Sequence, residues 1–110
     1  MIDQYEFGRI VIDGKEFTQD LIVFPDKVKE NWWRDQGHLL QVDDLNEVFF
    51  SKPEKLIVGT GFSGLMEVTD AVRRKVAELG IELIEKGSKE ACAAYNEEKG
   101  KAVLAIHLTC

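Results

Sequence analysis

The sequence predicts an α/β fold. We expect a compact single domain, residues 1–110, in which a mixed β-sheet combines a C-terminal parallel βαβαβ unit with an N-terminal β-hairpin region. From Lys55 onward, short apolar runs alternate with longer segments of helical periodicity, which is typical of parallel strands joined by crossover helices. The first half has short β-rich runs separated by Asp-Gly and proline. A chain of 110 residues also has room for only one core.

The N-terminal hairpin is predicted from a turn signal. Asp13–Gly14 readily takes the positive φ angles of a type I′ turn, and it lies between the β-rich runs Phe7–Val11 and Lys15–Phe17. The next predicted strand is Leu21–Phe24, which Pro25 ends because proline cannot donate a ladder hydrogen bond.

A further strand is predicted at Asn31–Arg34. Side chains alternate along a strand, so at most one of its two tryptophans should lie deep in the core. A short helix follows, because Asp44 and Glu47 have the spacing of a capping box. It should end near Ser51, since the residue before Pro53 is pushed out of helical geometry.

The C-terminal half is predicted as strand, helix, strand, helix, strand. Gly80 can end the first helix, Ser88 can cap the second and Gly100 can stop it. The predicted elements are a strand at Leu56–Val58, a helix at Leu65–Leu79, a strand at Ile81–Ile84, a helix at Lys89–Lys99 and a strand at Ala102–Leu108.

Composition excludes several classes of partner. Lys and Arg number 14 against 20 Asp and Glu, a formal charge of −6, so the surface should repel nucleic acid. No run of about 18 apolar residues occurs, so we expect no membrane segment. The opening residues lack the pattern of a secretion signal, and we expect a cytoplasmic location. Cys92 and Cys110 match neither a disulfide framework nor a zinc motif and should be thiols.

The sharpest motif has the pattern Gly-x-Gly-x-x-Gly and lies between an apolar strand and a predicted helix. Its residues are Gly59, Thr60, Gly61, Phe62, Ser63 and Gly64. In a dinucleotide-binding fold such a turn lets backbone amides at a helix start approach a pyrophosphate, and Glu85 lies near the position of the acidic ribose ligand. Three parallel strands are only half of such a domain. A second interpretation therefore stays open, in which the glycines build a sharp turn and close helix packing.

Tyr95 and Asn96 also have two interpretations. They follow the small residues Ala91–Ala94, which let a helix lie close to a sheet, so Tyr95 can bury its ring and Asn96 can bond backbone. Alternatively, both border a ligand pocket together with the glycine turn.

No catalytic or metal site is predicted. His107 lies in an alternating strand, where a packed or surface imidazole is the common case, and His38 lies in a predicted loop. Cys92 would be a nucleophile only with a lowered pKa. No His-Glu-x-x-His, Cys-x-x-Cys or Asp-rich calcium loop occurs, so we expect neither metal nor cofactor.

Several segments resemble one small domain family. They are Leu56–Gly61, Leu79–Glu82, Ala91–Asn96 and Gly100–Val103, with Gly14–Phe17, Asp20, Trp33 and Gly37–His38 upstream. On these residues the chain resembles the Mth-type domain family of unknown function, which includes the adipogenesis-associated Mth-domain protein and a mitochondrial assembly factor for respiratory complex I. The resemblance covers nearly the whole chain. It implies a compact α/β fold with a central mixed sheet and brings no established catalytic residues.

The chain departs from this family at Glu85–Ser88, where many members have a Met-x-Thr step. The assembly role of the mitochondrial relative implies a protein-interaction domain, and our leading hypothesis is a non-catalytic, assembly-type module with a protein partner. The chain also has aromatic residues that are not all easily buried, such as Trp32, Phe49 and Phe50, which agrees with this hypothesis. Ordinary core packing is the alternative account of most of them. The alternative hypothesis is a small-molecule or anion-binding protein, such as a nucleotide-binding protein or an enzyme, that uses the Gly59–Gly64 turn.

Overall fold

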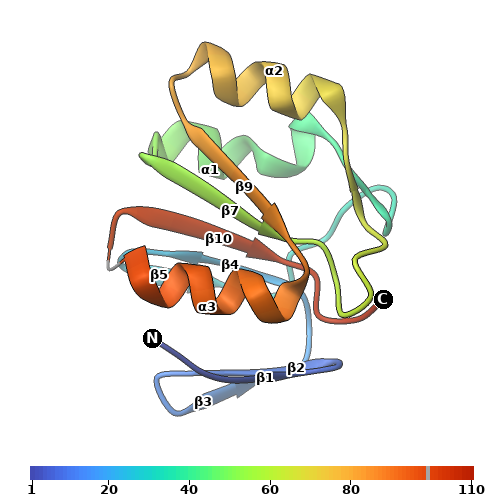
Figure 1. The fold of residues 1–110 in the computed structure, drawn as a ribbon, viewed down its shortest axis with the longest axis vertical. Helices are drawn as coiled ribbons and strands as arrows, with labels where there is room; N and C mark the ends of the chain where they lie inside the picture. The colour runs from blue at the N-terminus through green and yellow to red at the C-terminus, as the bar shows by residue number, and fades with distance from the viewer. Residues whose placement is uncertain (99) are drawn as a thin grey trace.

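The computed structural model describes residues 1–98 and 100–110, and its elements follow the predicted order with several additions (Figure 1). The strands are β1 (Ile2–Glu6), β2 (Arg9–Ile12), β3 (Lys15–Phe17), β4 (Leu21–Phe24), β5 (Lys27–Lys29), β6 (Leu39–Leu40), β7 (Lys55–Gly59), β8 (Glu67–Val68), β9 (Glu82–Lys86) and β10 (Ala102–Ile106). The helices are the 3₁₀ helix η1 (Val42–Leu45), α1 (Asn46–Ser51), α2 (Asp70–Glu78) and α3 (Ser88–Glu98).

A five-stranded mixed sheet forms the centre of the fold, in the order β5-β4-β10-β7-β9. β7 pairs in parallel with both β10 and β9, and β4 pairs antiparallel with β10. The chain therefore runs from β7 through α2 to β9, and from β9 through α3 to β10, which confirms the predicted parallel βαβαβ unit. β10 is buried along its whole length because it lies between β4 and β7.

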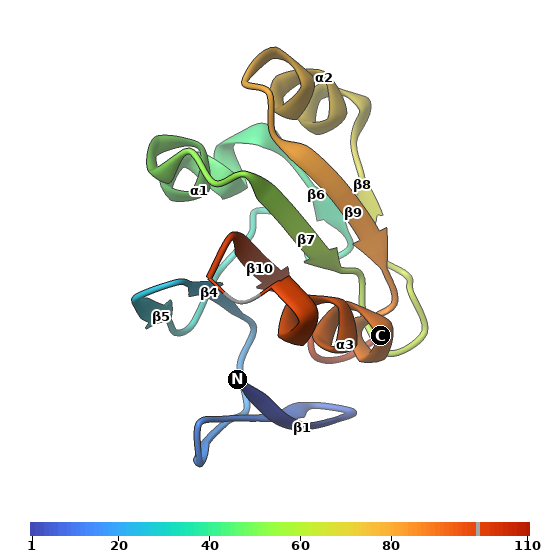
Figure 2. The same cartoon turned by 60° about the vertical axis from the view of Figure 1, so that its left-hand side comes forward.

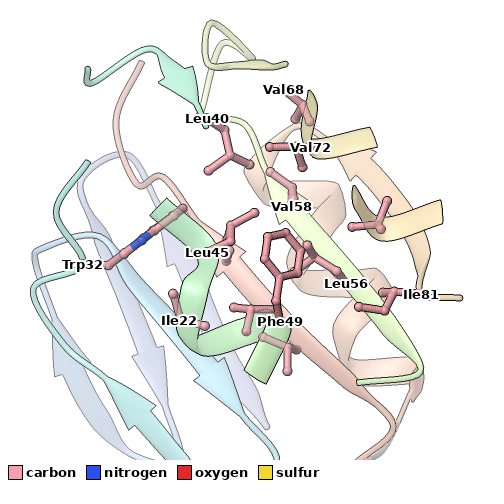
Figure 3. Close-up of a cluster of buried hydrophobic side chains, with 14 of the residues drawn as sticks. Ile22, Trp32, Leu40, Leu45, Phe49, Leu56, Val58, Val68, Val72 and Ile81 are labelled. Carbon is pink, nitrogen blue, oxygen red and sulfur yellow. The ribbon is translucent and has the colours of Figure 1, made fainter. Parts of the chain in front are cut away.

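The two faces of this sheet bury separate apolar clusters. Leu56 and Val58 of β7 pack with α1, α2 and η1 on one face, as Figure 3 shows, and Ile57 between them packs on the other face. On that second face, α3 and the sheet β1-β2-β3 cover the strands (Figure 1). The alternation of side chains along β7 thus divides the core between two layers.

The predicted N-terminal hairpin is confirmed. Asp13 and Gly14 have φ angles of 49° and 82°, both positive as a type I′ turn requires, and they join β2 to β3. β1 was not predicted, and it adds an antiparallel third strand beside β2. The sequence gives little signal for β1, because the strand has a polar centre, Asp3-Gln4, and only its first residue, Ile2, is buried.

The predicted strand at Asn31–Arg34 is wrong. Asn31 has a φ angle of 54°, which breaks an extended run, and the strand that follows β4 in the chain and pairs with it is β5. The amide of Trp32 instead donates to the carbonyl of Asp20, at 2.8 Å. Trp32 is 5% exposed and Trp33 is 78% exposed, so the expectation of a single buried tryptophan is confirmed.

The predicted cap of the short helix is displaced by one turn. Asp44 is the third residue of η1, and its carboxylate accepts from the amide of Gln41 at 2.8 Å. Glu47 pairs with Lys27 and Lys29 of β5 rather than with a cap. The helical region ends at Ser51, as predicted.

The first crossover helix starts five residues later than predicted. α2 begins at Asp70, where the side chain of Thr69 accepts from the amide of Val72, because Glu67–Val68 forms β8 and pairs with β6. The second helix begins at Ser88, and its predicted end at Lys99 lies outside the described residues. Within the part of the chain that the structure describes, no helix is long and apolar enough to cross a membrane.

Candidate functional site

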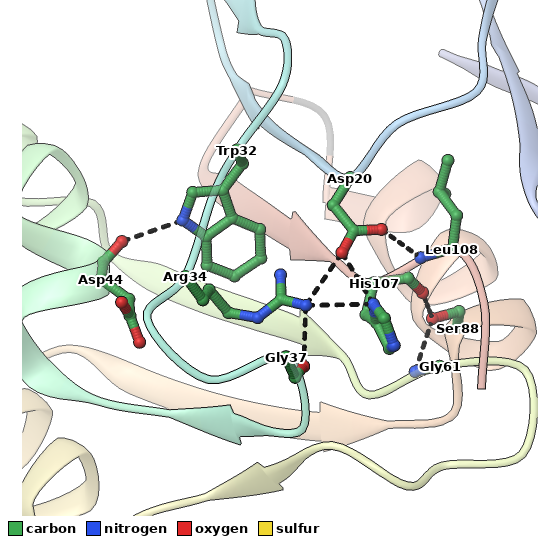
Figure 4. A network of polar contacts seen from close by, with 9 residues as sticks. All are labelled: Asp20, Trp32, Arg34, Gly37, Asp44, Gly61, Ser88, His107 and Leu108. Atoms are coloured by element: carbon green, nitrogen blue, oxygen red, sulfur yellow. Dashed lines mark hydrogen bonds and ion pairs between the residues drawn. The ribbon is translucent and has the colours of Figure 1, made fainter.

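The glycine turn lies at the carboxyl end of β7 and is fastened to α3. The amide of Gly61 donates to Ser88 Oγ at 2.9 Å, and the amide of Ser88 donates to the carbonyl of Gly61 at 3.0 Å. The Ser88 hydroxyl in turn donates to the carbonyl of His107 at 2.6 Å (Figure 4). Ser88 is therefore not the predicted helix cap but a buried link between the glycine turn, α3 and the end of β10.

Most backbone amides of the turn are consumed within the chain. Phosphate-binding loops leave such amides free for the ligand. Here six amides donate within the chain. The amide of Gly61 donates to the Ser88 hydroxyl, and the other five donate to backbone carbonyls: Thr60 to Lys86, Phe62 to Thr109, Gly64 to Gly61, Leu65 to Cys110 and Met66 to Thr60. No helix follows the turn directly, since β8 intervenes, so the strand-to-helix geometry of a dinucleotide site is absent from this part of the described structure.

The glycines of the turn serve close packing. A Cβ on Gly59 would lie 2.8 Å from the Ile106 side chain and 2.9 Å from Ser88 Oγ. Gly61 has a φ angle of 114°, and a Cβ there would lie 2.4 Å from the backbone carbon of Cys110. Side chains of other residues cannot occupy these positions, so the spacing of the glycines matches the second interpretation of the motif.

The side chains of Tyr95 and Asn96 are engaged in contacts with the N-terminal part of the chain. The Asn96 amide group accepts from the Ile2 amide at 2.8 Å and donates to the Ile2 carbonyl at 2.9 Å. Tyr95 packs against the cluster beneath the N-terminal sheet, and burial raises the pKa of its hydroxyl. Asn96 thus ties α3 to β1, and the partial burial of Tyr95 agrees with the packing interpretation.

A buried polar cluster lies beside the turn (Figure 4). Asp20 Oδ2 lies 2.9 Å from Arg34 Nη2 and 2.7 Å from His107 Nδ1, and Asp20 Oδ1 accepts from the Leu108 amide at 2.7 Å. Arg34 also donates to the carbonyl of Gly37 and stacks on the Trp32 ring at 4.7 Å. The cluster joins the loop before β4, the loop after Trp32 and the C-terminal residues.

Electrostatics keep Asp20 ionised within this cluster. Burial opposes the charge, but the hydrogen bonds from His107, the Leu108 amide and Arg34 outweigh it, so the pKa of Asp20 lies below its ordinary value. Arg34 Nε, Arg34 Nη1 and His107 Nε2 are buried without a hydrogen-bond partner among the described residues. Sequence reasoning treated His107 as a packed or surface imidazole and gave no role to Arg34, because residues 73 positions apart carry no local signal of contact.

Three large apolar side chains are exposed around the C-terminal residues. Phe7, in the turn between β1 and β2, is 56% exposed, and its ring meets that of Phe62 edge to face at 5.7 Å. Phe62 and Leu65 are 58% and 56% exposed, and their amides donate to Thr109 and Cys110. We call Phe7, Phe62 and Leu65 the apolar patch.

The aromatic residues named from sequence behave differently from one another. Trp32 and Phe49 are buried in the core, because η1 and α1 fold over that face of the sheet, so only part of this set is left exposed, as expected. Phe50 is 88% exposed and stands apart on α1. The patch residues were not identified as exposed aromatic candidates, since Phe62 had been considered only as a member of the glycine motif.

A cleft with a volume of about 690 Å³ lies where β8 faces the carboxyl end of β9. Thr60 and Gly64 of the glycine motif line it together with Arg73 and Glu85. The Arg73 guanidinium is already paired with Glu85, at 2.8 and 2.9 Å, and with Asp70 at 3.0 Å. The cleft therefore presents a neutralised arginine rather than a free anion ligand.

Cys92 and the possible metal ligands among the described residues give no sign of a reactive site. Burial raises the pKa of the Cys92 thiol to about 12, so this side chain is a packed thiol and a poor nucleophile at neutral pH. Among residues 1–98 and 100–110, no group of three or more metal-ligating side chains is brought together.

Comparisons with known proteins agree on the fold. The family described as a protein of unknown function (DUF498/DUF598) matches residues 2–107. A conserved hypothetical protein from Pyrococcus horikoshii OT3 is 28% identical, with 100% of this chain and 99% of that chain covered and a TM-score of 0.85. A Xanthomonas campestris protein is 21% identical, with 98% and 83% covered and a TM-score of 0.84. A Bordetella pertussis Mth938-like domain is 17% identical, with 98% and 85% covered and a TM-score of 0.67. None of the curated proteins matches.

Proposed function

The chain belongs to the DUF498/DUF598 family of proteins of unknown function, and from that premise we propose that it is a protein-interaction domain that binds its partner through the apolar patch. The observation that carries this proposal is the contact between the exposed rings of Phe7 and Phe62, which come from two distant segments of the chain, with the exposed Leu65 three residues after Phe62. A single exposed leucine or phenylalanine is ordinary, whereas a group of them rimmed by polar residues is typical of a binding surface.

The patch is also held in a defined shape. The Phe62 amide donates to Thr109 at 3.2 Å, the Leu65 amide to Cys110 at 3.0 Å, and the Gly8 amide beside Phe7 to Leu108 at 2.9 Å. The C-terminal residues thus fix the backbone beneath all three side chains. A pre-organised surface loses less conformational entropy on binding, which favours association.

The alternative hypothesis, a nucleotide or anion site in the glycine turn, has less support. Six backbone amides between Thr60 and Met66 already donate within the chain. An incoming phosphate would have to displace those hydrogen bonds. The net charge of −6 also disfavours polyanionic ligands.

A capture experiment with matched variants tests the proposal. The immobilised chain is exposed to extract of its native cells as wild type, as Phe7→Ser/Phe62→Ser and as Phe50→Ser. We expect a partner that wild type and Phe50→Ser retain and that the double variant loses. Phe50 is the control because it is 88% exposed and lies outside the patch. Equal retention by all three proteins, with equal thermal stability, would contradict the proposal.

We also propose that the protein works in the cytoplasm. Cys92 and Cys110 are both free thiols, which supports a reducing compartment. Fractionation of native cells should recover the protein with cytoplasmic markers, and recovery with an oxidising compartment would contradict this location.

A further inference from the structure

The two edges of the central sheet differ in their charge pattern. The sheet ends at β5 on one side and at β9 on the other (Figure 2). A sheet edge has unpaired backbone groups that can pair with another strand. β5 reads Lys-Val-Lys, so an antiparallel second copy centred on Val28 would place Lys27 opposite Lys29. Like charges directly opposite destabilise a strand pair, and this edge therefore disfavours its own copy.

The β9 edge is complementary to itself. β9 reads Glu-Leu-Ile-Glu-Lys, so an antiparallel second copy centred on Ile84 places Glu82 opposite Lys86 at both ends of the pair. Ile84 then lies opposite Ile84. These three residues share one face of the strand, because side chains alternate, and Ile84 marks that face as the one beneath α3. Two pairs of opposite charge would flank an apolar pair.

The backbone of β9 is in register for this pairing. The Glu82 amide donates to the Glu54 carbonyl, and the Lys86 carbonyl accepts from the Thr60 amide. The backbone groups of Glu82 and Lys86 therefore face β7 and the residues that flank it. Alternation along a parallel ladder turns the backbone groups of Leu83 and Glu85 to the outer edge. Centring on Ile84 puts Leu83 opposite Glu85, and these outward-facing residues can exchange hydrogen bonds.

The charged side chains of Glu82 and Lys86 are available for pairing with another molecule, because the charges next to them are already paired. Lys55, beside Glu82 on β7, donates to Glu98 at 2.9 Å, and Glu85 is held by Arg73. Among residues 1–98 and 100–110, Glu82 and Lys86 form no ion pair. Both are exposed and can meet opposite charges on another molecule.

We propose that β9 is a self-association edge, on which a second copy of this chain pairs its own β9 antiparallel about a two-fold axis through Ile84. The product is a dimer with one continuous sheet. A two-fold axis makes the two contacts identical, so a single Glu-x-x-x-Lys spacing supplies both charge pairs. This surface is distinct from the apolar patch.

Charge reversal tests this proposal by sedimentation velocity. We expect the wild-type chain to show a dimer whose population rises between about 10 μM and about 1 mM, the range of weak, small interfaces. Glu82→Lys and Lys86→Glu should each weaken the dimer about tenfold at low salt, since each substitution turns two attractive pairs into repulsive ones. The double variant Glu82→Lys/Lys86→Glu should recover the wild-type dissociation constant.

Amide exchange gives a second readout on the wild-type chain. The outward amides of Leu83 and Glu85 should exchange more slowly as the protein concentration rises, whereas the Val28 amide on β5 should not respond. A monomer over the whole range, a dimer that ignores the single reversals, or a double variant no better than the singles would overturn the proposal. The Phe7→Ser/Phe62→Ser variant should still dimerise, so failure here and failure of the apolar-patch proposal are distinguishable.

Discussion

The segment from Gly59 to Leu65 has two halves with opposite surroundings. In the first half, Gly61 touches the C-terminal backbone so closely that a Cβ would lie 2.4 Å from it. In the second half, Gly64 has only the Thr60 hydroxyl within contact distance, and Phe62 and Leu65 are more than half exposed. One half is built into the core, and the other presents apolar side chains to the surroundings.

This difference shows that glycine spacing alone does not define a phosphate loop. The same Gly-x-Gly-x-x-Gly pattern can aim amides at a ligand or release space for a neighbouring segment of chain. Here the amide of Gly61 points to Ser88 and that of Phe62 points to Thr109. The destination of the backbone donors, rather than the positions of the glycines, separates the two uses.

The largest expected effect is on stability, when a glycine in each half of the segment is replaced by alanine. Gly61→Ala should destabilise the fold by more than about 4 kcal/mol, because a Cβ must displace backbone and the φ angle of 114° is strained for alanine. Gly64→Ala should cost only about 1 kcal/mol, since its φ angle is 71° and the space is open. Urea unfolding measures both. Equal losses would show that the inner half is not more tightly packed than the outer half.

The next effect concerns the anchor of the inner half. Asp20 holds the Leu108 amide and so fixes the C-terminal residues on which Gly61 packs. Asp20→Ala should cost about 3 kcal/mol, since it leaves the buried Arg34 without its carboxylate. Asp26→Ala, at an exposed position, is the control and should change stability by less than about 0.5 kcal/mol. A loss at Asp20 no larger than this control would mean that the cluster does not anchor the C-terminus.

The same anchor makes stability depend on pH. The pKa of Asp20 is lowered in the fold, so the unfolded chain binds a proton first, and the contribution of Asp20 is present above the unfolded pKa of about 4. That contribution is lost as the pH falls through the lower, folded pKa. Unfolding free energies measured from about pH 6 to below about pH 3 should therefore converge for the wild type and Asp20→Asn. A constant difference between the two proteins would contradict this origin.

Local chemistry in the sequence was enough to predict the succession of strands and helices in the C-terminal half and the Asp13–Gly14 turn. Both depend on neighbouring residues: apolar periodicity in one case and positive φ angles in the other. The start of α2 was missed because β8 exists only through its pairing with β6, about 28 residues away along the chain. Thr69 is a good helix cap by its residue type, but the predicted helix was started at Leu65, directly after the glycine motif.

The candidate site was predicted less well than the fold. The sequence drew attention to the glycine turn, which lies beside both the cleft and the apolar patch, but it could not show where the amides of the turn point. Asp20, Arg34 and His107 meet through loops and a strand end distant in sequence, and no periodic pattern records that contact. Contacts of this kind depend on the complete fold.

The smallest expected effect belongs to the outer half. The Phe7 and Phe62 rings meet edge to face at 5.7 Å with an interplanar angle of 79°. A double-mutant cycle with Phe7→Ala and Phe62→Ala should give a coupling of about 0.5 kcal/mol, while each single substitution changes stability by less than about 1 kcal/mol because both rings are more than half exposed. The matched cycle of Phe7→Ala with Phe50→Ala should show no coupling.

Urea unfolding of these variants decides how far the two halves differ. No coupling between Phe7 and Phe62 would mean that the rings move independently, so the patch would not be a pre-organised surface. A single loss at Phe62 as large as that of Gly61→Ala would mean that the outer half also supports the core. A small, coupled effect leaves binding as the remaining physical reason to hold two large aromatic rings together in water, because their contact then adds little to folding.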